Sequence, residues 1–250
     1  MRPRLCTASA ALLYCRAMTT PLFRDDAYLT TAEAIVTEAG PDGLILDRSL
    51  FYAAGGGQPA DTGRLETADG VFVDITDARY TPDRGAIRLT SETELPPGAA
   101  VIQHLDWYRR YRIMRMHTAL HLLSVALPYP VTGGQIGESE SRLDFDIPDP
   151  NLDKDAIAAA VQALIDADHA VTTEWITDAE LDANPGLVKT MSVQPPRGSG
   201  KVRLVRIGDV DLQPCGGTHV ASTAEIGPIA VTKIEKKGRQ NRRVRIALVD

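Results

Sequence analysis

The apolar and polar positions in the first part of the chain form short runs separated by turn residues. Residues 43–47, 71–75 and 86–89 are rich in Leu, Ile, Val and Phe, and Gly, Pro and Asp flank them. Such runs predict β-strands. Their spacing is typical of a small antiparallel barrel or sandwich, and Pro96, Pro97 and Gly98 mark its end. We therefore expect a small β-barrel over roughly residues 20–100.

The second part of the chain has a helical period. Between residues 107 and 127 the apolar side chains recur every three or four positions. They are Ile113, Met116, Leu120, Leu123 and Leu127. Residues 151–170 repeat the period, with Asn151 or Asp153 as the expected N-cap. The apolar stripe of this second helix is Ile157, Val161, Leu164 and Ile165. Strand-like runs return at 144–147, 202–207, 229–234 and 244–249.

Together the patterns predict an α+β fold, in which a small N-terminal β-barrel precedes an α/β two-layer domain with helices packed on a mostly antiparallel sheet. We expect these domains at residues 18–100 and 101–250. The first seventeen residues look superficially like a short signal peptide, but Arg16 interrupts the apolar run. We expect residues 1–17 to be disordered or to reflect a mis-assigned start, with translation beginning at Met18.

Composition narrows the possible environments of the protein. The chain has 250 residues, a formal net charge of −6 and 44% apolar residues, enough for a substantial core. Three unevenly spaced cysteines favour a reducing compartment over a disulfide framework. No apolar run reaches the roughly 18 residues of a membrane span. We therefore expect a cytoplasmic protein without a membrane partner. The acidic average does not exclude nucleic acid, since binding depends on local basic patches.

Two pairs of residues have the spacing of metal ligands. His117 and His121 lie four positions apart within the first predicted helix, and Cys215 and His219 lie four apart near the C-terminus. Residues four apart on a helix share one face. Three imidazoles and one thiolate suit tetrahedral Zn²⁺. The long separation of the pairs fits either a structural staple or a catalytic cleft. A zincin protease is excluded, because Thr118 stands where that class has its glutamate base.

A glycine-rich segment precedes the first helix. Gly55, Gly56 and Gly57 are followed by Gln58 and Pro59. Successive glycines permit positive φ, and the proline restricts the exit from the turn. The segment is therefore either a tight structural loop or a stretch of backbone that approaches a ligand closely. The residues alone leave both interpretations open.

Taken in order, Gly-Gly-Gly-Gln-Pro-x-Asp-x-Gly, His-x-x-x-His and Cys-Gly-Gly-Thr-His resemble the alanyl-tRNA editing proteins, from about residue 20 to the C-terminus. These are freestanding relatives of the editing domain of alanyl-tRNA synthetase, related also to the second additional domain of threonyl-tRNA synthetase. The N-terminal barrel resembles their medium-length class. One departure is Ala53, where the family pattern has proline, so this position lacks the backbone restriction that proline imposes.

The resemblance implies a hydrolase that removes wrongly attached serine, with glycine as a second candidate, from the acceptor end of tRNA(Ala). It implies that His117, His121, Cys215 and His219 bind Zn²⁺. It also implies that Gln135 is a glutamine of the editing pocket, and that the hydroxyl of Thr118 can read the serine side chain. Two rival functions remain: a non-catalytic zinc-stapled RNA-binding module and a metallohydrolase of small esters.

Two basic clusters are candidate contacts for the tRNA backbone. They are Arg109, Arg110 and Arg112, before the first histidine pair, and Lys236, Lys237, Arg239 and Arg242, near the C-terminus. Asp211 is a candidate for orienting a ligand histidine from outside the metal's own ligands. A solvent-facing carboxylate on a strand is an equally good interpretation of Asp211.

Overall fold

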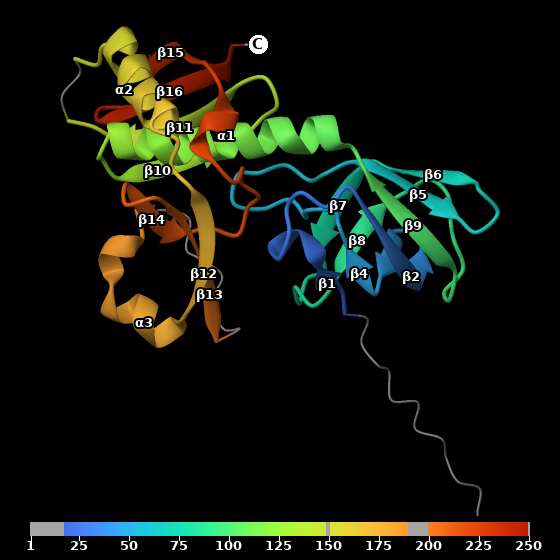
Figure 1. Cartoon of the computed structure of the whole chain (residues 1–250). Helices are drawn as coiled ribbons and strands as arrows, with labels where there is room; N and C mark the ends of the chain where they lie inside the picture. The colour runs from blue at the N-terminus through green and yellow to red at the C-terminus, as the bar shows by residue number, and fades with distance from the viewer. Residues whose placement is uncertain (1–17, 149–150, 190–199, 250) are drawn as a thin grey trace, which may run out of the picture.

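The computed structural model describes residues 18–148, 151–189 and 200–249, and the expectation for residues 1–17 lies outside this part. The chain folds into an α+β structure whose ladders are antiparallel except for one short parallel pair. Figure 1 shows the first strands gathered at one end of the molecule, with helix α1 running from them toward the remaining elements. None of the described helices combines the length and apolar character needed to cross a membrane.

The N-terminal strands form a seven-stranded sheet in the order β6-β5-β9-β2-β3-β8-β7. Their bounds are β2 Thr31–Gly40, β3 Gly43–Leu46, β5 Gly63–Thr67, β6 Phe72–Ile75, β7 Asp77–Tyr80, β8 Ile87–Thr90 and β9 Ala100–Leu105. The short strands β1 Thr20–Pro21 and β4 Arg48–Ser49 pair beside it in parallel. The predicted strands at 43–47, 71–75 and 86–89 are confirmed as β3, β6 and β8.

A closed barrel is not confirmed. The edge strands β6 and β7 are joined by Thr76 alone and do not pair with each other in the described chain. Antiparallel pairing of consecutive strands requires a turn of at least two residues between them. The sheet is therefore open, although its inner face encloses an apolar cluster that includes Leu46, Leu65 and Leu89. This sheet also extends to Leu105, because β9 pairs with both β2 and β5.

Helix α1, Trp107–Ala126, is the predicted first helix, and Asp106 caps it by accepting a hydrogen bond from the backbone N–H of Arg109. The five apolar side chains that predicted this helix are all buried. Helix α2, Lys154–Asp166, is capped by Asp153, one of the two expected residues, and buries Ile157, Val161 and Ile165. The helical periods thus identified both the helices and their buried faces.

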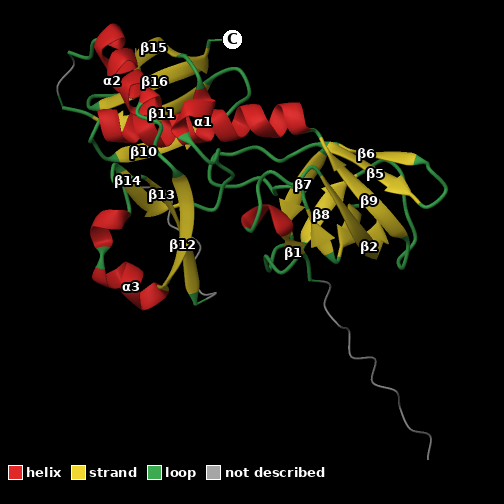
Figure 2. Cartoon of the chain, viewed as in Figure 1, coloured by secondary structure: helices red, strands yellow, loops and turns green. Residues whose placement is uncertain are grey.

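The two helices pack on a four-stranded antiparallel sheet in the order β10-β11-β16-β15 (Figure 2). Helix α1 contacts β11, α2 contacts β15, and the helices contact each other. The strand bounds are β10 Val131–Gln135, β11 Ser141–Asp146, β15 Ile229–Lys236 and β16 Asn241–Leu248. This arrangement confirms the expected layer of helices on an antiparallel sheet.

A three-stranded sheet, β12-β13-β14, completes the fold. Its strands are β12 Val171–Thr177, β13 Lys201–Ile207 and β14 Asp211–Pro214, and the short helix α3, Asp178–Ala183, follows β12. In Figures 1 and 2 this sheet projects away from the four-stranded sheet. Strand β14 leads directly into the segment that carries Cys215 and His219, so the sheet determines where these two side chains lie.

Candidate metal centre

Four side chains with metal-binding atoms meet beside the middle of helix α1. His117 and His121 come from successive turns of the helix, while Cys215 and His219 come from the segment after β14. One ligand atom from each residue lies within 4.8 Å of all the others. The Cys215 Sγ atom is 3.5 Å from Nε2 of His117 and 3.2 Å from Nε2 of His219. The two pairs identified in the sequence are therefore neighbours in space.

Each of the three imidazoles makes a hydrogen bond through Nδ1, the ring nitrogen other than Nε2. Nδ1 of His121 donates to Asp211 Oδ2 at 2.9 Å, and Nδ1 of His117 donates to Gln58 Oε1 at 2.9 Å. Nδ1 of His219 lies 3.1 Å from Thr118 Oγ1. Because the Thr118 hydroxyl donates to Met114 O, it accepts from His219. These bonds leave the Nε2 lone pairs of all three rings available to one ion.

This donor set fits zinc on chemical grounds. Three neutral imidazoles and one thiolate match the ligands and the coordination number that Zn²⁺ prefers. Burial of Cys215 raises the pKa of its thiol, but the neighbouring His117 and His219 outweigh this effect and hold the pKa well below its usual value. The cysteine is thus suited to bind as a thiolate. The residues present can therefore hold the metal that their sequence spacing predicts.

Asp211 lies at the start of β14 and is buried. Besides His121, its carboxylate accepts hydrogen bonds from Lys189 and from Gln213 Nε2, the latter at 2.8 Å. Burial raises the pKa of Asp211, but the bonds from His121 and Lys189 lower it to about 2. Of the two interpretations of this residue, the structure supports the first, because Asp211 is buried and contacts His121, a candidate ligand. Lys189 had no local sequence signal, because it lies 22 positions from Asp211.

The backbone of the turn between Cys215 and His219 contacts two side chains, those of Arg203 and His117. Arg203, on β13, donates from Nη1 to the carbonyl oxygens of Cys215 and Gly217 at 3.0 and 2.9 Å. A Cβ atom at residue 217 would lie 2.3 Å from Cε1 of His117 and 2.6 Å from Gln58 Oε1. Only glycine therefore allows the turn to lie directly against the ring of His117.

The glycine-rich loop reaches the metal centre through Gln58. Within the loop, Gly55 and Gln58 exchange backbone hydrogen bonds at 3.1 and 3.0 Å, and Gly56 and Gly57 have φ of +59° and +85°. The carbonyl of Gly57 accepts from Ile136 N at 2.8 Å. The loop therefore lies between the end of β10 and the His117 side of the centre. This position follows from tertiary contacts that the loop sequence does not reveal.

The two residues predicted to read the substrate differ in exposure. Gln135 ends β10 beside the loop and is exposed, and its Oε1 lies 3.4 Å from Nε of Arg142. Thr118 is fully buried, and its hydroxyl donates to Met114 O, accepts from His219 and also accepts from Val220 N at 3.3 Å. A substrate hydroxyl would have to displace one of these partners to contact Thr118.

The basic residues before the metal centre are largely committed to protein contacts. Arg110 is fully buried and paired with Asp61, so the expectation that it contacts tRNA is corrected. Arg109 pairs with Glu138 and donates to Ala60 O at 3.2 Å. Arg112 donates to Glu138 O at 3.1 Å, and its guanidinium carbon lies 5.6 Å from the centre of the Tyr108 ring.

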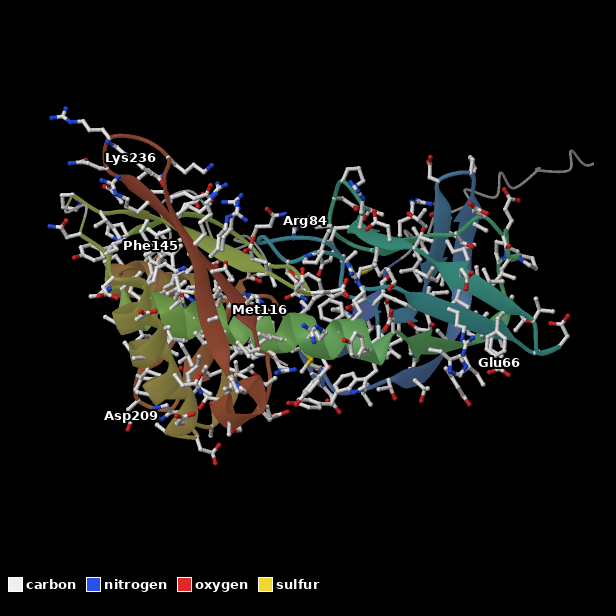
Figure 3. All side chains as sticks on the ribbon, turned by 90° about the horizontal axis from the view of Figure 1, so that it is seen from above. Glu66, Arg84, Met116, Phe145, Asp209 and Lys236 are labelled. Atoms are coloured by element: carbon white, nitrogen blue, oxygen red, sulfur yellow. The ribbon has the colours of Figure 1, made fainter. Side chains whose placement is uncertain are left out.

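The basic residues of the β15–β16 hairpin are mostly at the surface. Lys236 and Arg239 are exposed, and Figure 3 shows Lys236 at the outer end of the hairpin, across the molecule from Glu66. Lys237 lies 3.7 Å from Glu235. Arg242 is 6% exposed and bonds to the carbonyls of Gly238 and Asn241, so its expected tRNA contact is corrected as well.

Comparison with known proteins places this geometry in a family context. Residues 202–245 match the family model described as the threonyl and alanyl tRNA synthetase second additional domain. The chain is 34% identical to the alanyl-tRNA editing protein AlaX-M of Methanosarcina acetivorans, over 93% of this chain and 100% of that protein. It is 33% identical to AlaX-M of Saccharolobus solfataricus, over 91% of this chain and 98% of that protein. Alanine–tRNA ligase of Halobacterium salinarum is 35% identical over 87% of this chain and 25% of its own length.

Proposed function

The chain belongs to the alanyl-tRNA editing proteins, and on this premise we propose that it hydrolyses the ester between a wrongly attached amino acid and the terminal ribose of tRNA(Ala). Serine is the proposed main substrate, with glycine as the second. The observation that carries the proposal is the meeting of four metal-binding atoms beside the glycine-rich loop, in a chain that matches an editing protein over that protein's whole length.

We propose that His117, His121, Cys215 and His219 hold Zn²⁺. When bound, zinc supplies a Lewis acid that polarises the ester carbonyl, lowers the pKa of water or holds the substrate's amino group. The chain's own residues determine the orientation of the site. Asp211 orients the His121 ring by accepting from its Nδ1, and Arg203 holds the turn after Cys215 by donating to its carbonyl oxygens. Together they provide a preorganised site, which ester hydrolysis requires for rapid reaction.

Selectivity for serine requires a polar group that is satisfied by the serine hydroxyl and left unpaired by alanine. Gln135 is our candidate, because its amide is exposed at the end of β10 beside the loop. The contacts around Thr118 support a different role for that residue, since its hydroxyl is buried and bonded to His219. We propose that Thr118 acts by holding His219.

The acceptor arm of the tRNA requires a positively charged path. Lys236, Lys237 and Arg239 on the hairpin are the proposed phosphate contacts, because their charges lie at the surface. Arg109 and Arg112 are secondary candidates, since both also contact Glu138. We further propose that the two expected domains, residues 18–100 and 101–250, act as two units. Because β9 belongs to the N-terminal sheet, we place the boundary between them at Asp106.

The direct test is deacylation of serine-, glycine- and alanine-charged tRNA(Ala) by the purified protein, with the zinc content measured on the same sample. We expect release of serine, weaker release of glycine and retention of alanine. Cys215→Ala should lose both zinc and activity. His104→Gln is the matched control, because it removes a partly buried imidazole from β9, in the N-terminal sheet. Full activity and metal content in Cys215→Ala would contradict the site assignment.

The same samples separate the rival functions. Tight tRNA binding without release of any amino acid would favour a non-catalytic RNA-binding module. Hydrolysis of p-nitrophenyl acetate at a rate unaffected by tRNA, with no release of serine from tRNA, would favour a small-ester hydrolase. Both outcomes would contradict the proposed editing activity.

A further inference from the structure

Gln58 is the residue of the glycine-rich loop whose side chain enters the metal centre. Its side chain is buried, with 2% of the residue exposed, and it contacts two separate segments. Oε1 accepts from Nδ1 of His117 at 2.9 Å and from the backbone N–H of Thr218 at 3.1 Å. Nε2 donates to the hydroxyl of Thr218 at 3.0 Å. The amide therefore bridges helix α1 and the turn that carries Cys215 and His219.

The contact with Thr218 determines which end of the amide faces His117. A backbone N–H can only donate, so the atom that meets it must be the amide oxygen. This oxygen is also the atom nearest to the His117 ring, which therefore carries its proton on Nδ1. The Nε2 atom of His117 then presents a lone pair toward the Cys215 side of the centre. Gln58 thus selects the tautomer in which His117 can bind a metal.

The position of the amide is itself determined from two sides. The backbone of Gln58 is paired with Gly55, and the preceding carbonyl accepts from Ile136. On the other side, Gly217 lies against both the amide and the His117 ring, with no room for a Cβ atom. The loop therefore holds the side chain in place, and the contacts with His117 and Thr218 N require an acceptor at this position.

From these contacts we infer that Gln58 is a positioning residue for His117. Through Gln58, the N-terminal part of the chain supports metal binding by the C-terminal part. The inference rests on the proposed metal site. It gives the glycine-rich loop a role in the metal centre, because the loop delivers a hydrogen bond to a proposed ligand from outside the ligand set. Removal of such outer partners typically lowers metal affinity by about 10–100-fold.

The test compares Gln58→Leu with Gln58→Glu and a matched control. Leucine has similar size but cannot accept from Nδ1 of His117. A carboxylate can accept from both His117 and Thr218 N, and the Thr218 hydroxyl can rotate to donate to it. Gln103→Leu is the control: Gln103 is also buried, lies on β9, and bonds to Leu50 N and Arg48 O. It removes an equivalent amide whose hydrogen bonds go to the backbone of residues 48 and 50 and not to a ligand histidine.

Zinc affinity is measured by competition with a chromophoric chelator, and the visible absorption of the Co²⁺-loaded protein reports the ligand geometry. We expect Gln58→Leu to lower zinc affinity by about 10–100-fold and to change the Co²⁺ spectrum. In Gln58→Glu and Gln103→Leu, the zinc affinity and the Co²⁺ spectrum should stay close to those of the parent protein. Thermal unfolding of the metal-free variants checks that each is folded.

Parent-like affinity and spectrum in Gln58→Leu would overturn the inference, as would an equal decrease of affinity in Gln103→Leu or in Gln58→Glu. Failure of the proposed function has a separate signature. A zinc-loaded parent protein that releases no amino acid from charged tRNA would contradict editing, while the affinity comparison would still decide the role of Gln58.

Discussion

Arg110 and Asp61 form a buried ion pair that joins helix α1 to the segment after the glycine-rich loop. Nε of Arg110 donates to both carboxylate oxygens at 3.0 Å, and the side chains are 0% and 1% exposed. Arg110 also donates to the carbonyl oxygens of Ala27 and Leu50 at 2.9 and 2.8 Å. The guanidinium is thus bonded on several sides, and it aligns the helix that carries His117 with the loop that carries Gln58.

Replacing Arg110 with Met should strongly destabilise the protein. The change leaves the Asp61 carboxylate buried without its partner, which typically costs about 3–5 kcal/mol. The free energy of unfolding in urea measures the effect. Arg79→Met is the control, because it breaks an ion pair with Asp77 in which Arg79 is 76% exposed, and it should change stability little. Similar decreases in the two variants would contradict the structural importance of the buried pair.

Gly217→Ala should disturb the metal centre directly. The new Cβ atom would fall 2.5 Å from Nδ1 of His117 and 2.6 Å from Gln58 Oε1, so the ring or the turn must move. Forced overpacking of this kind costs about 1–3 kcal/mol. Zinc affinity and unfolding free energy should both fall. The neighbouring Gly216→Ala is the control, because its Cβ would meet nothing within 4 Å. Equal behaviour of the two variants would mean that the close approach is unimportant.

Thr118→Val tests whether the threonine holds His219 or reads the substrate. Valine keeps the shape but removes the hydroxyl that accepts from His219 Nδ1 and Val220 N. If Thr118 is a positioning residue, zinc affinity should fall by about 10–100-fold, and Thr118→Ser should restore it. If it reads serine instead, affinity should stay constant while discrimination between serine- and alanine-charged tRNA disappears. Measuring both quantities on one sample separates the two roles.

Removing the charges at the tip of the β15–β16 hairpin should weaken tRNA binding. For a duplex, eliminating one phosphate-binding charge should reduce the slope of log affinity against log salt by about 0.9. We therefore expect Lys236→Gln and Arg239→Gln to bind more weakly, with shallower salt dependence. Arg84→Gln removes an exposed charge from the turn after β7 and is the control. Unchanged affinity and slope in the hairpin variants would exclude this surface as the tRNA path.

Acid should weaken the protein partly through the ion pairs of the four-stranded sheet. The hydrogen bond from Arg245 is the main cause that lowers the pKa of Glu235 from 4.5 to about 2. Because the folded pKa is the lower one, the stabilisation is fully present above pH 4.5 and disappears as the pH falls toward 2. Arg245→Gln should therefore lower the free energy of unfolding at pH 6. It should also make the fall of this free energy between pH 4.5 and 2 less steep.

Unfolding free energies measured in urea at several pH values between 6 and 2 test this expectation. Arg206→Gln is the control for removal of one ion-paired arginine, because it breaks a pair with Glu174 outside the four-stranded sheet. A decline in Arg245→Gln as steep as that of the parent protein would mean that Glu235 contributes little to the acid response.

Local periodicity allowed much of the fold to be predicted. Helices α1 and α2 were identified because their apolar residues recur with the helical period, and Asp153, one of the two expected caps, stands at the N-cap of α2. Several strands were not predicted, among them β2, β9 and β12. Strands β10 and β14 give little local signal, because Val131–Gln135 contains two glycines and Asp211–Pro214 is too short to show alternation. The open edge of the N-terminal sheet was also missed, since pairing of strands depends on partners distant in the chain.

The family and the candidate ligands could be identified from the amino-acid sequence, because His117, His121, Cys215 and His219 stand in local motifs whose spacing carries the chemistry. Asp211 was already a candidate for orienting a ligand histidine, and the folded chain decided between its two interpretations and paired it with His121, 90 positions away. Gln58 is 59 positions from His117, so no local pattern could connect these two residues. The burial of Arg110 and Arg242 was equally hidden. Whether an arginine faces solvent or a buried partner depends on how distant segments pack, and the residue type alone does not encode it.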